Sequence, residues 1–292
     1  MTYRLKPDSE TVEAGIRRIA AEEFGRIAAV LAQADLPVPR QVHEVRKSAK
    51  RLRSLLRLIA PVFESAAAEN TLLRDAARSL SEARDSGAIL DSLTRLKLPA
   101  DAFAAIESVL QPDSASKTDA KAHTKLLKAF ERDMRSAAKR AAHWKLPAEG
   151  FDAIRPGLKR NYKRLLADFA EAIETGEEEA THNWRKSAKT HWHQTLLLNR
   201  ICPDAMDAHA RMASRLSASL GDWRDCGLLL EALKAAPADY IDKDVLKLTR
   251  RSALRHQKRL LRKAQRFSGL LTAEKPGALT VRWAAYWDAI TS

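Results

Sequence analysis

Two stretches of the sequence match each other and decide the fold: VHEVRKSAKRLRSLLRLI (42–59) and THNWRKSAKTHWHQTLLL (181–198). Six of eight aligned positions are identical, a histidine followed three positions later by RKSAK. The offset from His43 to His182 is 139 residues. An offset of this kind indicates an internal repeat, which has to be recognised before the fold is interpreted.

Three further pairs of segments support the repeat. LSEARDSGAILDSL (80–93) matches LGDWRDCGLLLEAL (220–233) at an offset of 140, and GIRR (15–18) matches GLKR (157–160) at an offset of 142. The basic segments 118–142 and 244–267 are alike in character but closer together. The shorter offset predicts an insertion in the first half, in the loop-rich stretch 98–117.

The composition predicts helices. Ala and Leu are abundant, whereas the chain has only nine Val, and its 11 prolines lie mostly between periodic segments. Ala and Leu favour helix, and β-branched residues favour strands. We therefore predict an all-α fold of two four-helix bundles related by a pseudo-two-fold internal repeat. The helices are expected near 8–33, 41–60, 66–97 and 118–143, and near 151–174, 180–200, 204–235 and 243–267. Residues 8–145 and 151–270 form the two halves of a single domain, 8–270.

A C-terminal tail follows at residues 271–292. Helical spacing places its Trp283, Trp287 and Ile290 on one face. We expect this face to pack back onto a bundle. The alternative is a tryptophan handle for attachment to a granule.

Charge and cysteine content narrow the classes of function. Lys and Arg number 51 against 37 Asp and Glu, a net charge of +14, which favours a polyanionic partner. Two cysteines are too few for a disulfide framework and favour a reducing cytoplasm. No apolar run approaches the ~20 residues of a membrane span, and the N-terminus resembles no signal peptide. We expect a cytoplasmic protein, and association with granules stays open as a second location.

The segment 42–59 predicts a helix with two distinct faces. Val45, Ala49, Leu52, Leu56 and Ile59 form an apolar stripe that is expected to face the core. A second stripe about 110° away on a helix of ~100° per residue carries a histidine and four cations with no acid among them. Its members are His43, Arg46, Lys50, Arg53 and Arg57.

The second copy and other helices add to the basic inventory. The stripe of the second copy consists of His182, Arg185 and Lys189, followed by Trp192 and Leu196, with His193 close in angle. Rows of Lys and Arg suit phosphate, because guanidinium binds its oxygens bidentately and Lys acts as a mobile charge. The further candidate ligands are Lys47, Arg51 and Lys186; Arg17, Arg18, Lys159 and Arg160; Lys125, Lys128 and Arg132; and Arg251, Arg255, Lys258 and Arg262.

The doubled HxxRKxxK, each copy followed some forty residues on by LxxxRDxG, resembles the CHAD family, named for its histidine-bearing α-helical domain. The resemblance implies two four-helix bundles around a basic central cavity that binds inorganic polyphosphate, with an association with storage granules. It maps the family's basic positions onto His43, Arg46, Lys50, Arg51 and Arg53, and onto His182, Arg185 and Lys189. Thr190 and Trp192 replace Arg51 and Arg53 in the second copy, so unequal contributions are expected.

Other classes of function can be weighed from the same residues. No Walker-type phosphate loop is present, and the stripes carry no carboxylate for a divalent cation, so we expect no enzyme activity, no metal and no cofactor. A phosphohistidine at His43 or His182 stays open. Nucleic acid ranks below polyphosphate, because Trp192 alone offers a stacking surface. The Arg84–Asp85 and Arg224–Asp225 pairs are interpreted as ties between helices. The sequence makes no prediction of the oligomeric state.

Overall fold

The fold is helical throughout the part of the chain that the structure, a computed structural model, describes. These are residues 3–33, 35–80, 85–110, 117–236 and 241–292, with side chains described outside 85–86 and 117–124. This part contains eleven α-helices, two short 3-10 helices and no strand. The all-α prediction is confirmed. None of the described helices is both long enough and apolar enough to cross a bilayer.

The first half of the chain contributes six α-helices. Thr11 begins the first of them, because its Oγ1 accepts a hydrogen bond from the Ala14 amide at 3.2 Å. Pro39 lies in the first turn of the second, where its missing amide hydrogen costs nothing. The helices are α1 (Val12–Leu31), α2 (Val38–Ile59), α3 (Ala66–Arg78), α4 (Asp85–Arg95), α5 (Ala100–Leu110) and α6 (Lys117–Ala141).

The second half contributes five. Gly176, at φ 66°, ends the first of them in the left-handed conformation that glycine adopts readily. The Asp242 side chain accepts from the amides of Asp244 and Val245 and begins the fourth. The helices are α7 (Arg155–Thr175), α8 (Glu178–Leu197), α9 (Pro203–Ala235), α10 (Lys243–Leu271) and α11 (Pro276–Thr291), with 3-10 turns η2 (Gly150–Ala153) and η3 (Asn199–Ile201).

Two expectations for the first half are wrong. The single helix expected at 66–97 is two helices, α3 and α4, of which α4 packs against α9 of the second half. The stretch 98–117, expected to be a loop, contains α5. Its Ala102 and Ile106, four residues apart, are buried, and Ile106 belongs to a small core with Leu229 and Leu233 of α9. These two apolar side chains anchor the segment, as a helix, on the surface of the second half.

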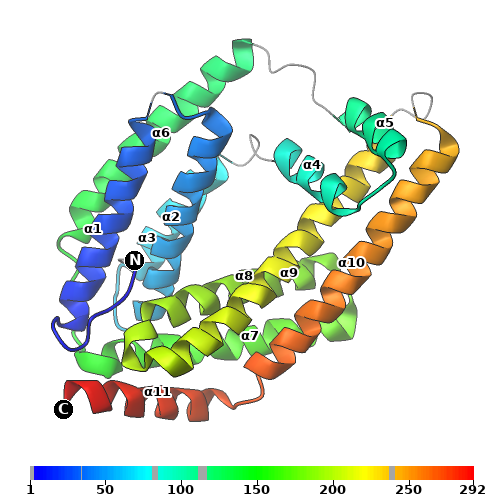
Figure 1. Cartoon of the computed structure of the whole chain (residues 1–292). Helices are drawn as coiled ribbons and strands as arrows, with labels where there is room; N and C mark the ends of the chain where they lie inside the picture. The colour runs from blue at the N-terminus through cyan, green and yellow to red at the C-terminus, as the bar shows by residue number, and fades with distance from the viewer. Residues whose placement is uncertain (1–2, 34, 81–84, 111–116, 237–240) are drawn as a thin grey trace.

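The helices form two groups that meet at α2, α7 and α8 (Figure 1). α1 packs against α2 and α6, and α3 packs against α2. In the second group α8 packs against α7 and α9, and α10 against α9. α4 and α5 lie beside the ends of α9 and α10, away from the other first-half helices (Figure 1). The chain of the first half therefore covers part of the second.

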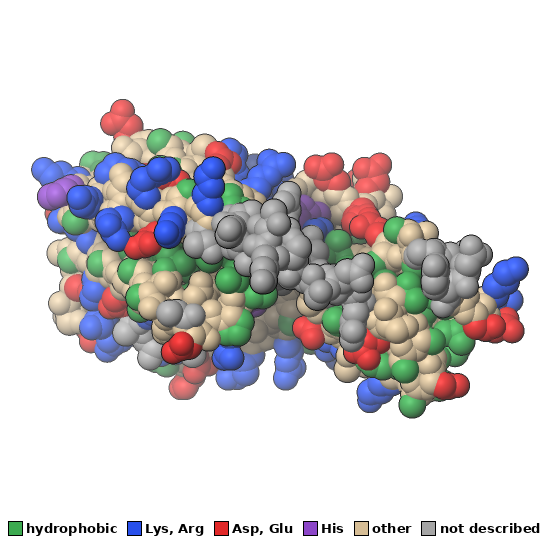
Figure 2. All heavy atoms as spheres, turned by 90° about the horizontal axis from the view of Figure 1, so that it is seen from above, with side chains coloured by type: hydrophobic (Ala, Val, Ile, Leu, Met, Phe, Trp, Pro, Cys, Tyr) green, Lys and Arg blue, Asp and Glu red, His purple; other side chains and the backbone are tan. Residues whose placement is uncertain are grey.

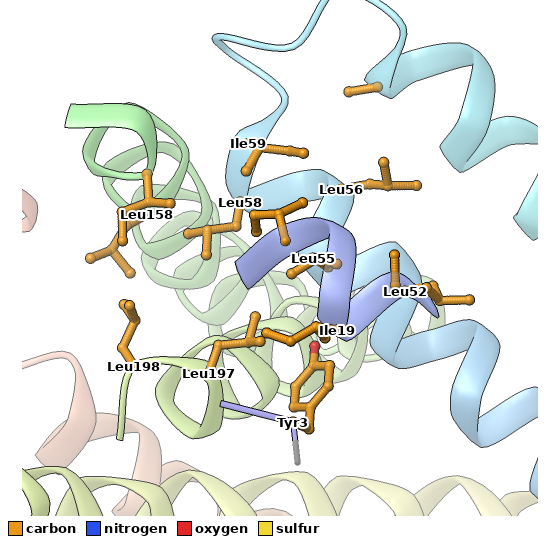
Figure 3. Close-up of a cluster of buried hydrophobic side chains, with 14 of the residues drawn as sticks. Tyr3, Ile19, Leu52, Leu55, Leu56, Leu58, Ile59, Leu158, Leu197 and Leu198 are labelled. Carbon is orange, nitrogen blue, oxygen red and sulfur yellow. The ribbon is translucent and has the colours of Figure 1, made fainter. Parts of the chain in front are cut away.

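A core of aliphatic side chains holds the two groups together. Leu55 and Leu58 of α2 lie close to Leu158 of α7 and Leu197 of α8, all of them fully buried (Figure 3). Gly157 allows this approach, because a Cβ there would lie 1.7 Å from the backbone oxygen of Leu58. The glycine of GLKR is thus required by the contact between α7 and α2.

The tail is part of the core. Trp283 and Trp287 of α11 are buried, and Ile290 packs against the same cluster. The expectation that this face packs back onto the bundle is confirmed. The alternative, a tryptophan handle for a granule, is wrong for these two side chains because they are covered by the protein itself.

Candidate functional site

The two helices that carry the repeated pattern, α2 and α8, contact each other at Ser54 and His193. The Ser54 hydroxyl lies 3.1 Å from Nδ1 of His193. Gln194 Nε2 donates to the backbone oxygen of Ser54 at 3.4 Å. One turn further along α2, Arg57 Nη1 donates to Oγ1 of Thr190 at 2.6 Å. These contacts fix the rotation of α2 and α8 about their own axes, and so decide which side chains of each helix face the other.

The apolar stripe of α2 sets the direction of its basic stripe. Val45, Ala49, Leu52, Leu56 and Ile59 are all fully buried, as their spacing predicted. Burial of one face of a helix turns the adjacent face toward the surface. The N-terminal half of the basic stripe therefore lies at the edge of the core, where it can meet a ligand.

A cleft of about 580 Å³ lies between α2, α8 and α9, and we call it the basic cleft. From α2 it is lined by a histidine and four cations, and from α8 by two cations, two aromatic rings and one leucine. The α2 residues are His43, Arg46, Lys47, Lys50 and Arg51, and the α8 residues are Arg185, Lys189, Trp192, His193 and Leu196. The structure thus brings cations from both copies of the repeat into one cleft.

Several of these cations are also tied to the protein. Arg46 Nη1 donates to the backbone oxygen of Ala77 at 2.6 Å. The Arg51 guanidinium lies 5.4 Å from the centre of the Tyr3 ring and within 3.3 Å of Glu23 Oε1. Such contacts hold side chains in place before a ligand arrives and reduce the entropy lost on binding. The side chain of His43 is 55% exposed at the edge of the cleft.

Lys189 and Trp192 form a contact of their own on α8. The Lys189 Nζ lies 4.2 Å from the centre of the Trp192 ring, a cation–π geometry. The ring therefore supports a cation at the wall of the cleft. Lys189 corresponds to Lys50 of the first copy, and Trp192 stands where α2 carries Arg53.

The third wall, from α9, was missed by the sequence analysis. It presents Ser214, Ser217, Gly221, Asp222 and Asp225 to the cleft. Small residues at spacings of three and four were the available signal, because they mark a helix face that leaves space open. The two carboxylates face the cations across the cleft, and Asp222 Oδ1 lies 3.5 Å from Arg95 Nη1. The cleft therefore has a basic side, from α2 and α8, and an acidic side, from α9.

The repeated Arg–Asp pairs were predicted to tie helices together, and this stays a prediction. Asp225 lines the basic cleft. Arg224 lies close enough to His182 to disfavour its charged form. The Arg84–Asp85 pair lies outside the described residues.

The two histidines of α8 that were predicted to bind the ligand are largely uncharged at neutral pH. His193 is buried, and burial, with Lys189 and Arg51 nearby, holds its pKa well below the usual range. Burial also lowers the pKa of His182 to about 4, helped by Lys186, Arg224 and Arg185. His182 does not line the basic cleft, and its Nδ1 is buried with no hydrogen-bond partner among the described residues.

Three predicted cations of the repeat lie elsewhere. Arg53 Nε donates to Oδ1 of Asn70 on α3 at 3.1 Å, and burial, together with Arg57 and Arg74, lowers its pKa to about 10. Arg57 and Lys186 line a separate pocket against α7. The basic stripe of α2 is therefore divided between two sites. Its N-terminal members line the basic cleft, whereas Arg57, beyond the contact between Ser54 and His193, lines the separate pocket.

The cations of the first helix in each half do not line the cleft. Arg17 Nε donates to the backbone oxygen of Trp144, and Arg17 also pairs with Glu13. Arg18 pairs with Glu10 and Glu22. Lys159 and Arg160 are exposed on α7, and Arg160 Nη2 donates to the backbone oxygen of Arg57 at 3.3 Å.

The basic rows of α6 and α10 remain on the outer surface. Lys125, Lys128 and Arg132 are exposed on α6, and Arg132 lies 3.4 Å from Asp133. Arg251, Arg255, Lys258 and Arg262 are likewise exposed on α10, and none of the seven lines the basic cleft. Lys and Arg side chains are spread widely over the surface seen in Figure 2, so net charge alone does not locate the site.

The described side chains offer no cluster of metal ligands. Across the described residues, no three His, Cys, Asp or Glu side chains are grouped as candidate ligands of one ion. Cys202 is half-buried and Cys226 is buried, and both are free thiols.

Comparisons with known proteins bear on this architecture. The CHAD domain model matches residues 12–234. The crystal structure of the CHAD domain from the plant Ricinus communis superposes with a TM-score of 0.63, covering 98% of this chain and 94% of that one at 18% identity, a likeness of fold. No curated protein matches the chain. Because the family model covers well over half of the sequence, including both repeated helices, the chain belongs to the CHAD domain family.

Proposed function

We propose that the chain binds inorganic polyphosphate in the basic cleft. The observation that carries this proposal is the convergence of cations from both copies of the repeat on one cleft: Arg46 and Lys50 from α2, Arg185 and Lys189 from α8. A phosphate polymer offers closely spaced anionic oxygens, which match Arg forks and mobile Lys charges. Membership of the CHAD family supports the same ligand, because the family is associated with polyphosphate binding in general.

The repeat itself supports a shared site. Ser54 and His193 are 139 residues apart, the same offset as His43 and His182, and they touch each other. Equivalent positions of two copies meet only where a two-fold axis would pass. We infer that a pseudo-two-fold axis through this contact relates two four-helix halves and places both basic stripes at one junction.

We also propose that binding occurs without catalysis. Cleavage of a phosphoanhydride needs a placed nucleophile with its base, or a metal-activated water. His193 Nδ1 faces Ser54, and His43 lies at the exposed edge of the cleft. The Ser54 hydroxyl that meets His193 is buried and does not line the cleft, and the Glu44 carboxylate lies 4.0 Å from Nε2 of His43 on the exposed surface. The phosphohistidine alternative is tested by incubating the protein with labelled polyphosphate and looking for acid-labile label.

Nucleic acid is the alternative ligand, since it shares the phosphate backbone. Single-strand binders place several aromatic rings along a basic groove. Here Trp192 is the one tryptophan in the cleft, and the Lys189 ammonium covers its ring at 4.2 Å. The cleft therefore favours a polymer without bases. We also propose that the protein is located in the cytoplasm and that polyphosphate granules are a further location.

Competition between the two polymers tests the proposal. Labelled long-chain polyphosphate is bound to the full chain at physiological salt and challenged with single-stranded nucleic acid or unlabelled polyphosphate. We expect unlabelled polyphosphate to compete far better, and the affinity to fall steeply with log salt because counterions are released. A chelator should leave binding intact. Equal competition by nucleic acid, or loss of binding with chelator at constant salt, contradicts the proposal.

A further inference from the structure

A second polar pocket lies between α2, α7 and α8, and we call it the α7 pocket. It encloses about 260 Å³, less than half the volume of the basic cleft. Three cations and one carboxylate line it, together with two Asn side chains and two hydroxyl groups. The charged and amide residues are Arg57, Asn161, Arg164, Asp168, Asn183 and Lys186.

The α7 pocket is separate from the basic cleft. On α8 it is lined by Asn183, Ser187 and Thr190, whereas the cleft is lined by Arg185 and Lys189. At ~100° per residue these sets lie on nearly opposite faces of the helix. The buried contact between Ser54 and His193 lies between the two sites on the α2 side. A ligand in one is therefore not in contact with the other.

The charge inside the pocket is unbalanced. Asp168 is 3% exposed and accepts a hydrogen bond from Arg164 Nε at 2.5 Å, so one cation is paired. Glu179 and Asp168 attract Lys186, whereas Arg164 and Arg57 repel it. Three cations of the lining therefore share Asp168 inside the pocket and Glu179 near it. Burial, with Arg160 nearby, lowers the pKa of Arg57, and burial does the same for Lys186. A bound anion would reverse both effects, because it favours the charged forms.

The lining also identifies the class of anion. It contains no apolar or aromatic side chain, so nothing in it would hold a base or a ring. Arg57 and Lys186 supply charged donors, and Asn183 and Ser187 can add neutral ones. Asp168 is an acceptor when ionised, so it suits an oxyanion that still carries a proton. Monohydrogen phosphate has such a proton at neutral pH, whereas sulfate and the interior units of polyphosphate have none.

We propose that the α7 pocket is a second anion site, which binds a single inorganic orthophosphate with Arg57 and Lys186 as its charged donors and Asp168 as the acceptor of its proton. The site does not depend on polyphosphate binding in the basic cleft. It would give the chain separate sites for the polymer and for its monomer.

Calorimetric titration of the full chain with orthophosphate and with sulfate, at constant ionic strength, tests the proposal. We expect one saturable phosphate per chain. Arg57→Gln with Lys186→Gln should weaken it by about tenfold or more, since two charge-assisted hydrogen bonds are lost. The control, Lys145→Gln with Arg211→Gln, removes the same charge from exposed positions and should change the affinity by less than about twofold. Lys186→Gln alone serves where the double variant melts early.

Selectivity gives an independent measurement. The native protein should prefer phosphate to sulfate by about tenfold, and Asp168→Asn should abolish that preference by admitting an unprotonated anion. The proposal is overturned if no saturable phosphate binds, if the α7 pocket variants bind it like the native chain, or if phosphate binding is lost instead in Lys50→Glu with Lys189→Glu. If polyphosphate binding does not depend on Lys50 and Lys189, the proposed function is contradicted, and the proposal of an orthophosphate site is unaffected.

Discussion

α2 and α8 carry the same RKSAK sequence, but they present it to different surroundings. The His43 side chain of α2 is 55% exposed, whereas its counterpart His182 is half-buried with a pKa of about 4. α2 lines the basic cleft with cations and a histidine only. α8 adds two cations and fills the rest of its wall with Trp192, His193 and Leu196.

The difference arises at the positions where the copies diverge and from the neighbours of each helix. Arg51 and Arg57 of α2 correspond to Thr190 and Leu196 of α8. The neighbours also differ, because α8 packs against α2, α7 and α9, whereas α2 packs against α1, α3, α7 and α8. A repeated sequence thus determines a repeated helix, and the packing around it decides which copy supplies charge and which supplies structure.

The largest effect is expected from reversing one cation of each copy. Lys50→Glu with Lys189→Glu replaces two attractive charges by two repulsive ones in the same cleft. Polyphosphate affinity should fall by roughly a hundredfold or more at physiological salt, since several counterion-releasing contacts are lost. Binding of labelled polyphosphate measures the loss, with helical circular dichroism to check the fold.

The control for this variant is Lys139→Glu with Lys145→Glu. Both lysines are exposed and outside the cleft, and the change in net charge is the same. We expect a loss of less than about threefold from long-range electrostatics. Equal losses from the two variants would leave net charge, and not the convergence of α2 and α8, as the source of affinity.

A smaller effect should distinguish His182 from His43 in how the free energy of unfolding falls at acid pH. Burial lowers the pKa of His182 to about 4 in the folded protein, below its value of about 6.5 in the unfolded chain. The unfolded state then binds more protons between these values, so this contribution to stability is present above pH 6.5 and is lost as the pH falls toward 4. Denaturant unfolding at pH 7 and pH 4.5 measures it.

His182→Gln should flatten this decline by an amount on the order of 1 kcal/mol, allowing for screening of a partly exposed side chain. His43→Gln, at an exposed position, is the control for the same substitution outside a buried site. The buried His191, His193 and His209, whose pKa values are also lowered by burial, should maintain a residual slope in both variants. Parallel curves for the native chain and His182→Gln would contradict the assigned burial of this imidazole.

The smallest effect concerns the pH dependence of binding. A polyanion in the basic cleft favours the protonated form of His43, so binding takes up protons and affinity rises as the pH falls from 8 to 6. We expect a gain of about threefold to fivefold in titrations with polyphosphate. His43→Gln should remove it and His182→Gln should keep it, because His182 lies outside the cleft. The opposite pattern would show that the ligand lies beside His182, outside the basic cleft.

Much of the fold could be predicted because the repeat and the helical periodicity are local properties. The stripe from Val45 to Ile59 is buried as its spacing required. α5 was missed because its apolar pair, Ala102 and Ile106, becomes helical only against the surface of α9 and α10. The division between α3 and α4 depends in the same way on a contact with the other half of the chain.

The site could be predicted where a charge row adjoins a buried stripe, as on α2. The predicted rows on α6 and α10 lie outside the basic cleft, since a basic helix face does not reveal whether it turns toward a cleft or toward solvent. Arg17 and Arg18 are a different case, because Glu13 and Glu22, one turn away in the sequence, already indicated their ion pairs. The α9 wall, made of small residues and the two carboxylates Asp222 and Asp225, carried no signal in a search for cations.

The contact between Ser54 and His193 bears on how such a chain can evolve. In a homodimer of identical halves, a position on the symmetry axis meets its own copy, so both partners are the same residue and change together. Once two copies are joined in one chain, each can change alone. With the pseudo-two-fold axis that we propose, a serine and a histidine can then face each other on the axis, and a hydroxyl can pair with an imidazole nitrogen. Tandem duplication therefore opens combinations of residues that a symmetric ancestor could not have sampled.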